Sequence, residues 1–222
     1  KLRGMFGFAV WNEKEQTLML VRDFFGIKPV YYAVIDGHFV FASEIKSILA
    51  FPGYERKVNQ KALEQYLSFQ YSPLEETFFK GIYKLMPGHM LLYKNGSYEI
   101  KTYFKPKLTP SQWDRKTNME QLRSQLAEIL KDSVKHHMLS DVEVGAFLSG
   151  GVDSGYLASA SGADQAFTLG FDEGDRYSEV NKAAKVAEKA GLKHHVKIIS
   201  KQEFWDALPD VMYHMDEPLG DA

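Results

Sequence analysis

The stretch Val-Gly-Ala-Phe-Leu-Ser-Gly-Gly-Val-Asp-Ser, residues 144–154, decides the fold of the second half of the chain. Its apolar part, residues 144–148, predicts a short buried strand, and residues 152–160 predict a helix. The polar turn between them therefore falls at a helix N-terminus, where unpaired N–H groups and partial positive charge favour an anion. We predict that this turn binds phosphate.

The residue types in the turn suit both a phosphate chain and its metal ion. Gly150 and Gly151 allow a ligand to approach the backbone closely. Ser149 and Ser154 can each donate a hydroxyl hydrogen bond, whereas Asp153 offers the oxygen ligand that Mg²⁺ prefers. The turn has no lysine, and the string G-x-x-x-x-G-K-[ST] occurs nowhere in the chain, which argues against an ordinary kinase or GTPase loop. The alternative is a glycine-rich strand-to-helix turn with a serine cap.

The sequence around this turn predicts alternating strands and helices. Expected strands cover residues 144–148, 166–171 and 194–199. Helix signals precede the first of these strands at the capping-box pair Thr117 and Glu120, fall between the second and third at the terminating Gly191, and follow the third at a second pair, Ser200 and Glu203. The alternation predicts an α/β fold with a doubly wound parallel sheet, in which ligands bind outside the carboxyl ends of the strands.

Two leucines are candidates for the nucleotide pocket. Short right-handed connections would place the strand 166–171 beside the strand that ends at Leu148. Leu148 and Leu169 would then flank an adenine ring. The alternative is that both are interior leucines, because periodicity does not separate a pocket wall from a core.

The first hundred residues have a dense β pattern. Apolar and aromatic runs separated by short polar or glycine-containing turns predict three hairpins, and the sheet is expected to be largely meandering. Ser43 and Asn59 are expected to cap short helices. The predicted hairpin turns are residues 12–16, Asp36-Gly37 and Asn95-Gly96.

Composition limits the class of protein. With 222 residues, 45% of them apolar, the chain can form one large or two modest globular domains. A net charge of −2 without a basic run argues against nucleic acid or an anionic membrane and favours small-molecule partners. The absence of cysteine excludes disulfides and thiolate sites from these residues. No long apolar run or signal peptide is present, so we expect a cytoplasmic protein, and we interpret Lys1 and Ala222 as cuts in a longer chain.

Three further clusters have competing interpretations. His194 and His195 are adjacent on an expected strand and so point to opposite faces, which predicts structural roles and no metal site. The Arg22-Asp23 pair is expected to be a structural clamp. Asp216-Glu217, where Pro218 forces the chain out of a helix, orient a substrate amine or a metal in one interpretation and form a solvated helix exit in the other.

The string Ser-Gly-Gly-Val-Asp-Ser, residues 149–154, resembles the PP-loop of the ATP pyrophosphatase superfamily. Three segments of the first half, residues 2–11, 22–32 and 41–46, resemble the later part of an N-terminal-nucleophile glutaminase domain. Together with residues 147–154, 167–171 and 213–218, in this order, they identify the chain as similar to glutamine-hydrolysing asparagine synthetases. The resemblance covers nearly the whole chain.

The resemblance implies the organisation of the chain. Residues 1–106 would be the later part of a glutaminase domain with an α+β, layered α/β/β/α fold, residues 107–117 a linker, and residues 118–222 the first part of an α/β PP-loop synthetase domain. The N-terminal part of the first domain and the C-terminal part of the second would be missing. The family's glutaminase nucleophile, an N-terminal cysteine, is absent, so no catalytic residue for glutamine hydrolysis is expected here, and the fragment alone is expected to be inactive.

The resemblance also implies a chemistry. Glutamine or ammonia would supply nitrogen, and ATP with Mg²⁺ would activate the side-chain carboxylate of aspartate as an adenylate, releasing AMP and pyrophosphate. A homodimer is expected from the family alone. Related PP-loop amidotransferases, such as β-lactam-forming synthetases, and a non-catalytic nucleotide-binding relative are the alternatives. The residues expected at ATP, pyrophosphate and Mg²⁺ are Leu148, Ser149, Gly150, Gly151, Asp153, Ser154 and Leu169, with Asp153 on the metal and Asp216 and Glu217 on the substrate side.

Overall fold

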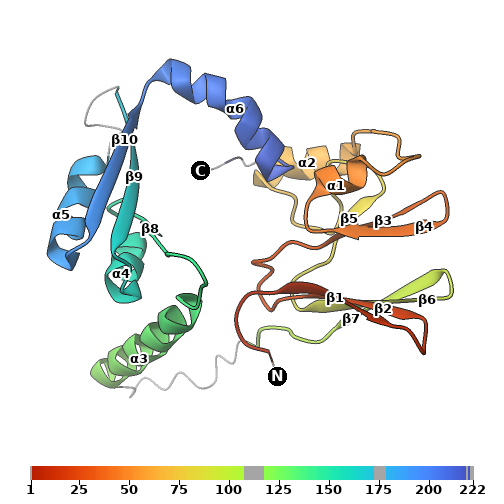
Figure 1. The fold of residues 1–222 in the computed structure, drawn as a ribbon, viewed down its shortest axis with the longest axis horizontal. Helices are drawn as coiled ribbons and strands as arrows, with labels where there is room; N and C mark the ends of the chain where they lie inside the picture. The colour runs from red at the N-terminus through yellow and green to blue at the C-terminus, as the bar shows by residue number, and fades with distance from the viewer. Residues whose placement is uncertain (1, 108–117, 173–178, 219, 221–222) are drawn as a thin grey trace. The chain divides into compact units, whose positions relative to one another are not determined.

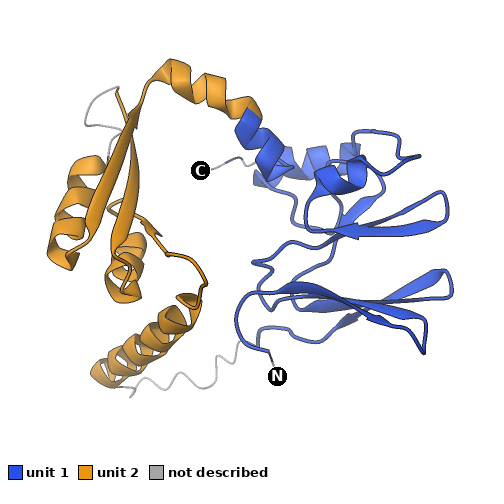
Figure 2. Ribbon diagram, viewed as in Figure 1, with its two compact units in different colours: residues 1–108, 210–222 blue, residues 109–209 orange. Residues whose placement is uncertain are grey.

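The computed structural model describes residues 2–107, 118–172, 179–218 and 220. The chain divides into two compact units, one of residues 1–108 and 210–222 and the other of residues 109–209 (Figures 1 and 2). Both contain helices and strands, which confirms a mixed α and β protein. The expected linker at residues 107–117 lies almost wholly outside the described residues. No described helix combines the length and the apolar character needed to cross a membrane.

The larger sheet of the first unit has four antiparallel strands in the order β1-β2-β6-β7. Its inward face includes Leu20 and Leu91, which are fully buried in one apolar cluster with Val30, Tyr32 and Leu85. The sheet joins two of the predicted hairpins through the β2–β6 pairing, which follows no local signal. The strands are β1 (Gly7–Asn12), β2 (Thr17–Arg22), β6 (His89–Lys94) and β7 (Ser97–Thr102).

A second sheet, in the order β4-β3-β5, corrects the expectation of one largely meandering sheet. Its strands are β3 (Tyr31–Ile35), β4 (His38–Ala42) and β5 (Ile82–Lys84). The helices α1 (Ile45–Leu49) and α2 (Gln60–Phe69) belong to this unit, and α1 buries Ile45 and Ile48 in the same cluster as Ala33, Ile35 and Ile82.

Two tight turns of the first unit are those that the sequence predicts. Asp36 and Gly37 have φ of 48° and 79°, and Asn95 and Gly96 have φ of 52° and 78°. Two consecutive left-handed residues match the twist of the flanking strands, as in type I′ hairpins. The N-cap residue of α1 is Glu44 and not the predicted Ser43, whereas Asn59 is the N-cap residue of α2 as predicted. Neither Glu44 nor Asn59 makes a side-chain cap hydrogen bond.

The second unit has a parallel sheet in the order β10-β9-β8. Its strands are β8 (Ala146–Phe147), β9 (Gln165–Phe171) and β10 (Lys193–Ile199). Its helices are α3 (Met119–His137), α4 (Val152–Ser161), α5 (Val180–Ala190) and α6 (Lys201–Met215), the last of which runs past the division at residue 209. Leu148, Ala158 and Ala166 are buried together with Ala183 and Ala187 of α5.

The two faces of β9 differ within this unit. Ala166, Thr168 and Gly170 are buried on the face that contacts α4 and α5, whereas the alternating residues Phe167, Leu169 and Phe171 are 38–54% exposed. The parallel sheet and its alternation with helices agree with the prediction. Helices on both faces, the mark of a doubly wound sheet, are not seen among the described residues.

The helix ends test the capping predictions. Ser200 and Glu203 form the predicted capping box, with each backbone N–H donating to the other residue's side chain. Gly191 ends α5 with φ of 69°. The cap of α3 is Asn118, whose side chain accepts from the Glu120 N–H, and Thr117 of the predicted box lies outside the described residues.

Candidate nucleotide site

The Ser-Gly-Gly turn connects β8 to α4. The Leu148 N–H still bonds to the Phe167 carbonyl at 2.9 Å, so the chain leaves the sheet directly afterwards. Gly150 has φ of +78°, and an added Cβ there would lie 2.7 Å from Lys182 Cβ and 2.9 Å from the Ala183 nitrogen. Only glycine satisfies both the left-handed backbone and the close approach to α5. The glycine at position 150 therefore holds the turn against the helix behind it.

The two serines converge in front of the turn. Their side-chain oxygens lie 3.0 Å apart, and Ser154 Oγ also accepts the Ser149 N–H at 3.3 Å. A Cβ added to Gly151 would lie 3.5 Å from Ser149 Oγ and 3.9 Å from Ser154 Oγ. The space that the two hydroxyls border is thus kept free by the absence of a side chain at position 151.

A pocket of about 320 Å³ opens over the carboxyl ends of β8 and β9. Leu148 and Leu169 both line it, together with Ser149 and Ser154, so the structure brings four of the expected residues together. Leu148 is 1% exposed and belongs equally to the core, whereas Leu169 is 54% exposed. The other lining residues are Phe147, Phe167, Phe171 and Glu179.

Some of these lining residues carried a signal in the sequence. Phe167 and Phe171 lie two positions from Leu169 on a strand, so they share its face. Glu179 precedes α5 and gave no signal, because its place in the pocket depends on tertiary packing.

The residues present fit an anion and a magnesium ion. Gly151 is the N-cap of α4 and makes no side-chain cap bond, so the first-turn N–H groups of the helix are not capped from within the turn. Asp153 is the acidic residue of that first turn. The described residues contain no cluster of three or more His, Asp or Glu side chains suited to a metal. Mg²⁺ needs no such cluster, since it is commonly held by one or two carboxylates together with substrate phosphates and water.

The adjacent histidines of β10 have the separate roles that strand geometry predicts. His194 Nε2 lies 2.7 Å from the Thr168 hydroxyl, and because that hydroxyl donates to the Leu148 carbonyl at 2.6 Å, the histidine is the donor. His195 stacks on Phe167 with ring centroids 4.9 Å apart and contacts Gln165 through Nε2. The two imidazoles therefore stabilise opposite faces of the sheet.

Arg22 and Asp23 of the first unit form a structural clamp through the backbone. The Arg22 guanidinium donates to the carbonyls of Gly26, Lys28 and Leu85. The Asp23 carboxylate, in a residue 1% exposed, accepts N–H groups from Phe6, Phe25, Ile27 and Lys28. Burial opposes its charge, but these four donors hold the pKa of Asp23 below its usual value.

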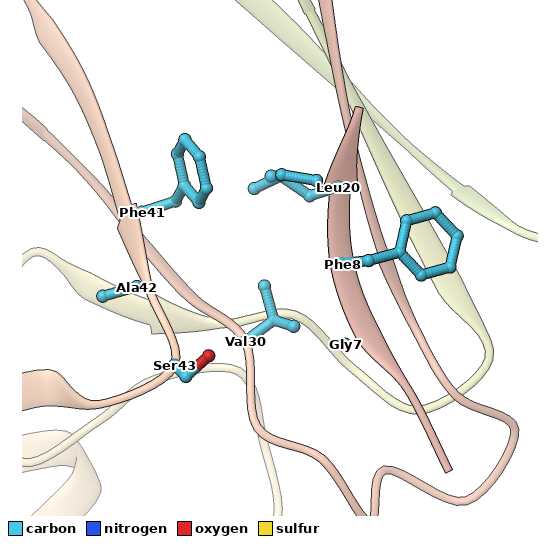
Figure 3. A pocket seen from close by; sticks show the side chains of 8 residues that line it. Gly7, Phe8, Leu20, Val30, Phe41, Ala42 and Ser43 are labelled. Carbon is cyan, nitrogen blue, oxygen red and sulfur yellow. The ribbon is translucent and has the colours of Figure 1, made fainter. Parts of the chain in front are cut away.

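The first unit also contains an apolar hollow of about 200 Å³ between its two sheets. In Figure 3 the Leu20 side chain points toward Phe41 across it, and Val30 lies beneath. Ser43 is the one polar side chain among its lining residues, so they offer no acid–base pair or activated nucleophile. The lining residues are Gly7, Phe8, Ala9, Leu20, Val30, Phe41, Ala42 and Ser43.

Asp216 and Glu217 pack within a different unit from the one that contains the turn at residues 149–154. Both belong to the first unit, where the Asp216 carboxylate contacts α1 and the Glu217 carboxylate accepts the Phe78 N–H at 2.9 Å. Neither is a solvated helix exit. Both carboxylates already have partners within the chain.

Comparison with known proteins agrees with this division of features. Residues 1–104 match the glutamine amidotransferase domain, and residues 125–222 match asparagine synthase. Both parts of the chain are therefore similar to glutamine-hydrolysing asparagine synthetases. The family match of the second part begins in α3 and contains the whole Ser-Gly-Gly turn.

Relatives of known name align with the whole chain. It is 38% identical to "Asparagine synthetase [glutamine-hydrolyzing] 1" of Bacillus subtilis and 36% identical to "Putative asparagine synthetase [glutamine-hydrolyzing]" of Mycobacterium bovis. Each alignment covers 100% of this chain and 35% of the relative, so the chain spans about a third of their length. The NH3-dependent NAD synthetase of Campylobacter jejuni is 21% identical over 43% of this chain and 42% of its own, with a TM-score of 0.28, which does not establish a shared fold.

Proposed function

We propose that the complete protein makes asparagine from aspartate, with glutamine or ammonia as nitrogen donor, and releases AMP and pyrophosphate. The observation that carries this proposal is the pocket over the carboxyl ends of β8 and β9, where Ser149, Ser154, Leu148 and Leu169 meet at the N-terminus of α4. Such a helix end, with hydroxyl donors beside it, suits the charge of a triphosphate. ATP, when bound, supplies an adenylyl group. Transfer of that group to a carboxylate oxygen of aspartate, which is a poor leaving group, would let this oxygen leave as part of AMP.

Each part of the turn has a role in this proposal. The hydroxyls of Ser149 and Ser154 and the first-turn N–H groups of α4 hold the β- and γ-phosphates, which leave together as pyrophosphate. Gly150 fixes the turn, and Gly151 leaves the space that the phosphates enter. Asp153 contributes a carboxylate to Mg²⁺. Leu169 and Leu148 form apolar walls for the adenosine.

The two parts of the chain divide the work. We assign residues 1–106 to the later part of the glutaminase domain, residues 107–117 to a linker, and residues 118–222 to the first part of a doubly wound PP-loop synthetase domain. The matches at residues 1–104 and 125–222 support this division. The parallel order β10-β9-β8 supports the fold of the second part.

The test uses the complete protein with ATP, Mg²⁺ and ammonium. Aspartate-dependent formation of AMP and pyrophosphate in equal amounts is expected, and ADP with phosphate would reject adenylation. An acceptor other than aspartate would point to a related amidotransferase. Asp153→Ala is expected to abolish synthesis and to leave glutamine hydrolysis intact. Equal loss of both activities would show that Asp153 supports folding instead.

A further inference from the structure

The end of α6 is part of the first unit although the sequence match to asparagine synthase continues to residue 222. The Asp216 N–H still bonds to the Met212 carbonyl at 3.1 Å, and Asp216 then takes φ of 63°. Aspartate adopts this left-handed conformation more readily than most residues other than glycine. The chain leaves the helix at this residue, and its carboxylate contacts α1.

The Asp216 carboxylate caps α1 from a distance in sequence of about 170 residues. Its two oxygens accept the N–H groups of Ile45 at 2.7 Å and Lys46 at 3.2 Å. Glu44, the local N-cap residue, makes no side-chain cap bond. Asp216 therefore supplies the negative cap that the sequence beside α1 does not supply.

Lys46 joins the same contact from the other side. Its ammonium lies 3.1 Å from the Asp216 carboxylate and 3.3 Å from that of Glu44, and it sits 5.3 Å from the centre of the Tyr213 ring. The Lys46 and Asp216 side chains are only 17% and 8% exposed. Burial alone would lower the pKa of Lys46, but the two carboxylates raise it above its usual value. Two residues of the segment after Pro209 thus hold one buried cation.

Glu217 fixes the next residue of the chain to a different part of the unit. Its carboxylate accepts the Phe78 N–H at 2.9 Å. Burial raises the pKa of Glu217, against the effect of this hydrogen bond and of nearby Lys84. Burial and the Glu217 charge also raise the pKa of Tyr31 to about 12. Consecutive carboxylates are therefore held by α1 and by the segment before β5.

We propose that Asp216 and Glu217 are positioning residues that fasten the end of α6 to the amidotransferase unit and so couple glutamine hydrolysis to asparagine synthesis. This inference rests on the proposed function. α6 begins at Lys201, after β10 of the second unit, and ends at Met215, next to Asp216 and Glu217 of the first unit. We call the contacts of these two carboxylates the anchor, and a single helix thus runs from the nucleotide-binding unit to the anchor. A carboxylate that caps α1 and neutralises Lys46 is occupied by those tasks and does not serve as an aspartate ligand.

The experiment compares nitrogen donors in the complete protein. Asp216→Ala and Lys46→Met are each expected to raise the glutamine consumed per asparagine formed by about fivefold, the effect of roughly 1 kcal/mol. Synthesis with saturating ammonium should stay within about twofold of wild type, since it needs no coupling. The double variant should consume no more glutamine per asparagine formed than the poorer single variant, because both substitutions remove the same contact between Asp216 and Lys46. The exposed Glu64→Gln is the matched control on the same unit.

Each outcome decides. A fall in ammonium-dependent kcat/KM for aspartate with Asp216→Ala but not with Lys46→Met would overturn the inference in favour of a substrate ligand. An unchanged ratio in both variants would show that the anchor has no part in coupling. Failure to make AMP with wild-type protein would reject the proposed function instead, so the two failures are separate. If Asp216→Ala does not fold, Asp216→Asn, which keeps one oxygen acceptor and loses the ion pair, gives the same comparison.

Discussion

The side-chain oxygens of Ser149 and Ser154 lie 3.0 Å apart across the space that Gly151 leaves open. Hydroxyls at this separation bond to each other without a ligand and can both turn toward a phosphate oxygen. A methyl group at position 151 would contact both of them at ordinary van der Waals distance. The two hydroxyls therefore border a space that holds no side chain, because residue 151 is glycine.

Gly151→Ala is expected to leave the fold intact and to weaken nucleotide binding. The residue has φ of −73°, which alanine adopts without strain, and the added Cβ makes no contact below 3.5 Å. The methyl group occupies the space where the phosphates would lie, so we expect at least a tenfold rise in the KM for ATP, or about 1.4 kcal/mol. Thermal unfolding and pyrophosphate release measure the two effects. An unchanged KM would remove phosphate from this side of the turn.

Gly150→Ala should behave in the opposite way and damage the fold first. A left-handed φ costs a non-glycine residue about 1–2 kcal/mol, and the Cβ would also meet Lys182 and Ala183 of α5 below 3.0 Å. We expect a lower melting temperature of the second unit, measured by calorimetry, with loss of binding as a consequence. A variant as stable as wild type would show that the turn is not held against α5 as described.

Substitutions of the two leucines of the pocket should likewise differ, one acting mainly on stability and the other mainly on nucleotide binding. Leu148→Ala removes a side chain that is 1% exposed and should destabilise the protein by about 2–5 kcal/mol. Leu169→Ala removes one that is 54% exposed and should cost far less stability. If both form the adenosine walls, the Leu169 variant should still raise the KM for ATP relative to that for aspartate. If the Leu169 variant has the same KM for ATP and the same KM for aspartate as wild type, Leu169 is an ordinary surface residue.

Local signals predicted the parts of the structure that local chemistry determines. Asp36-Gly37 and Asn95-Gly96 form the expected hairpin turns because few residue pairs adopt two successive positive φ values. Ser200 and Glu203 form the expected capping box because its partners are three residues apart. The parallel strands at residues 165–171 and 193–199 followed from apolar runs and alternation with helices.

Contacts between distant segments could not be predicted in this way. The pairing of β2 with β6 joins two hairpins into one sheet and leaves β3, β4 and β5 in another, and no turn signal predicts that pairing. The sequence around α1 suggested a cap by Ser43. In the structure the Ile45 N–H at the start of α1 instead donates to the distant Asp216. In the pocket, the expected adjacency of two neighbouring strands indicated Leu169, whereas the place of Glu179 depends on how α5 packs.

Asp23→Asn is expected to destabilise the first unit strongly. The carboxylate accepts four backbone N–H groups, and an amide would direct its own NH2 at some of them, leaving buried donors unpaired at about 1–3 kcal/mol each. Because the folded pKa of Asp23 lies below its unfolded value, its contribution is present above about pH 4 and is lost as the pH falls through the folded pKa. Urea unfolding between pH 3 and 7 tests this, with Glu64→Gln as control. A variant whose deficit does not shrink in acid would contradict it.

Glu217→Gln should leave the fold at least as stable as wild type at neutral pH. The amide oxygen still accepts the Phe78 N–H. Burial disfavours the charged carboxylate and so raises the pKa of Glu217, and the substitution removes that charge. For an acid whose folded pKa is raised, the folded state holds its proton more tightly, so stability is lost as the pH rises from the unfolded pKa through the folded one. The stability advantage of the glutamine variant should therefore grow from pH 4 to pH 7 in paired unfolding measurements. Glu217→Ala, which loses the acceptor for Phe78, should show no such advantage. If the glutamine variant is instead the less stable at pH 7, the electrostatic attraction of nearby Lys84 for the Glu217 carboxylate outweighs burial, and that carboxylate is charged in the folded protein.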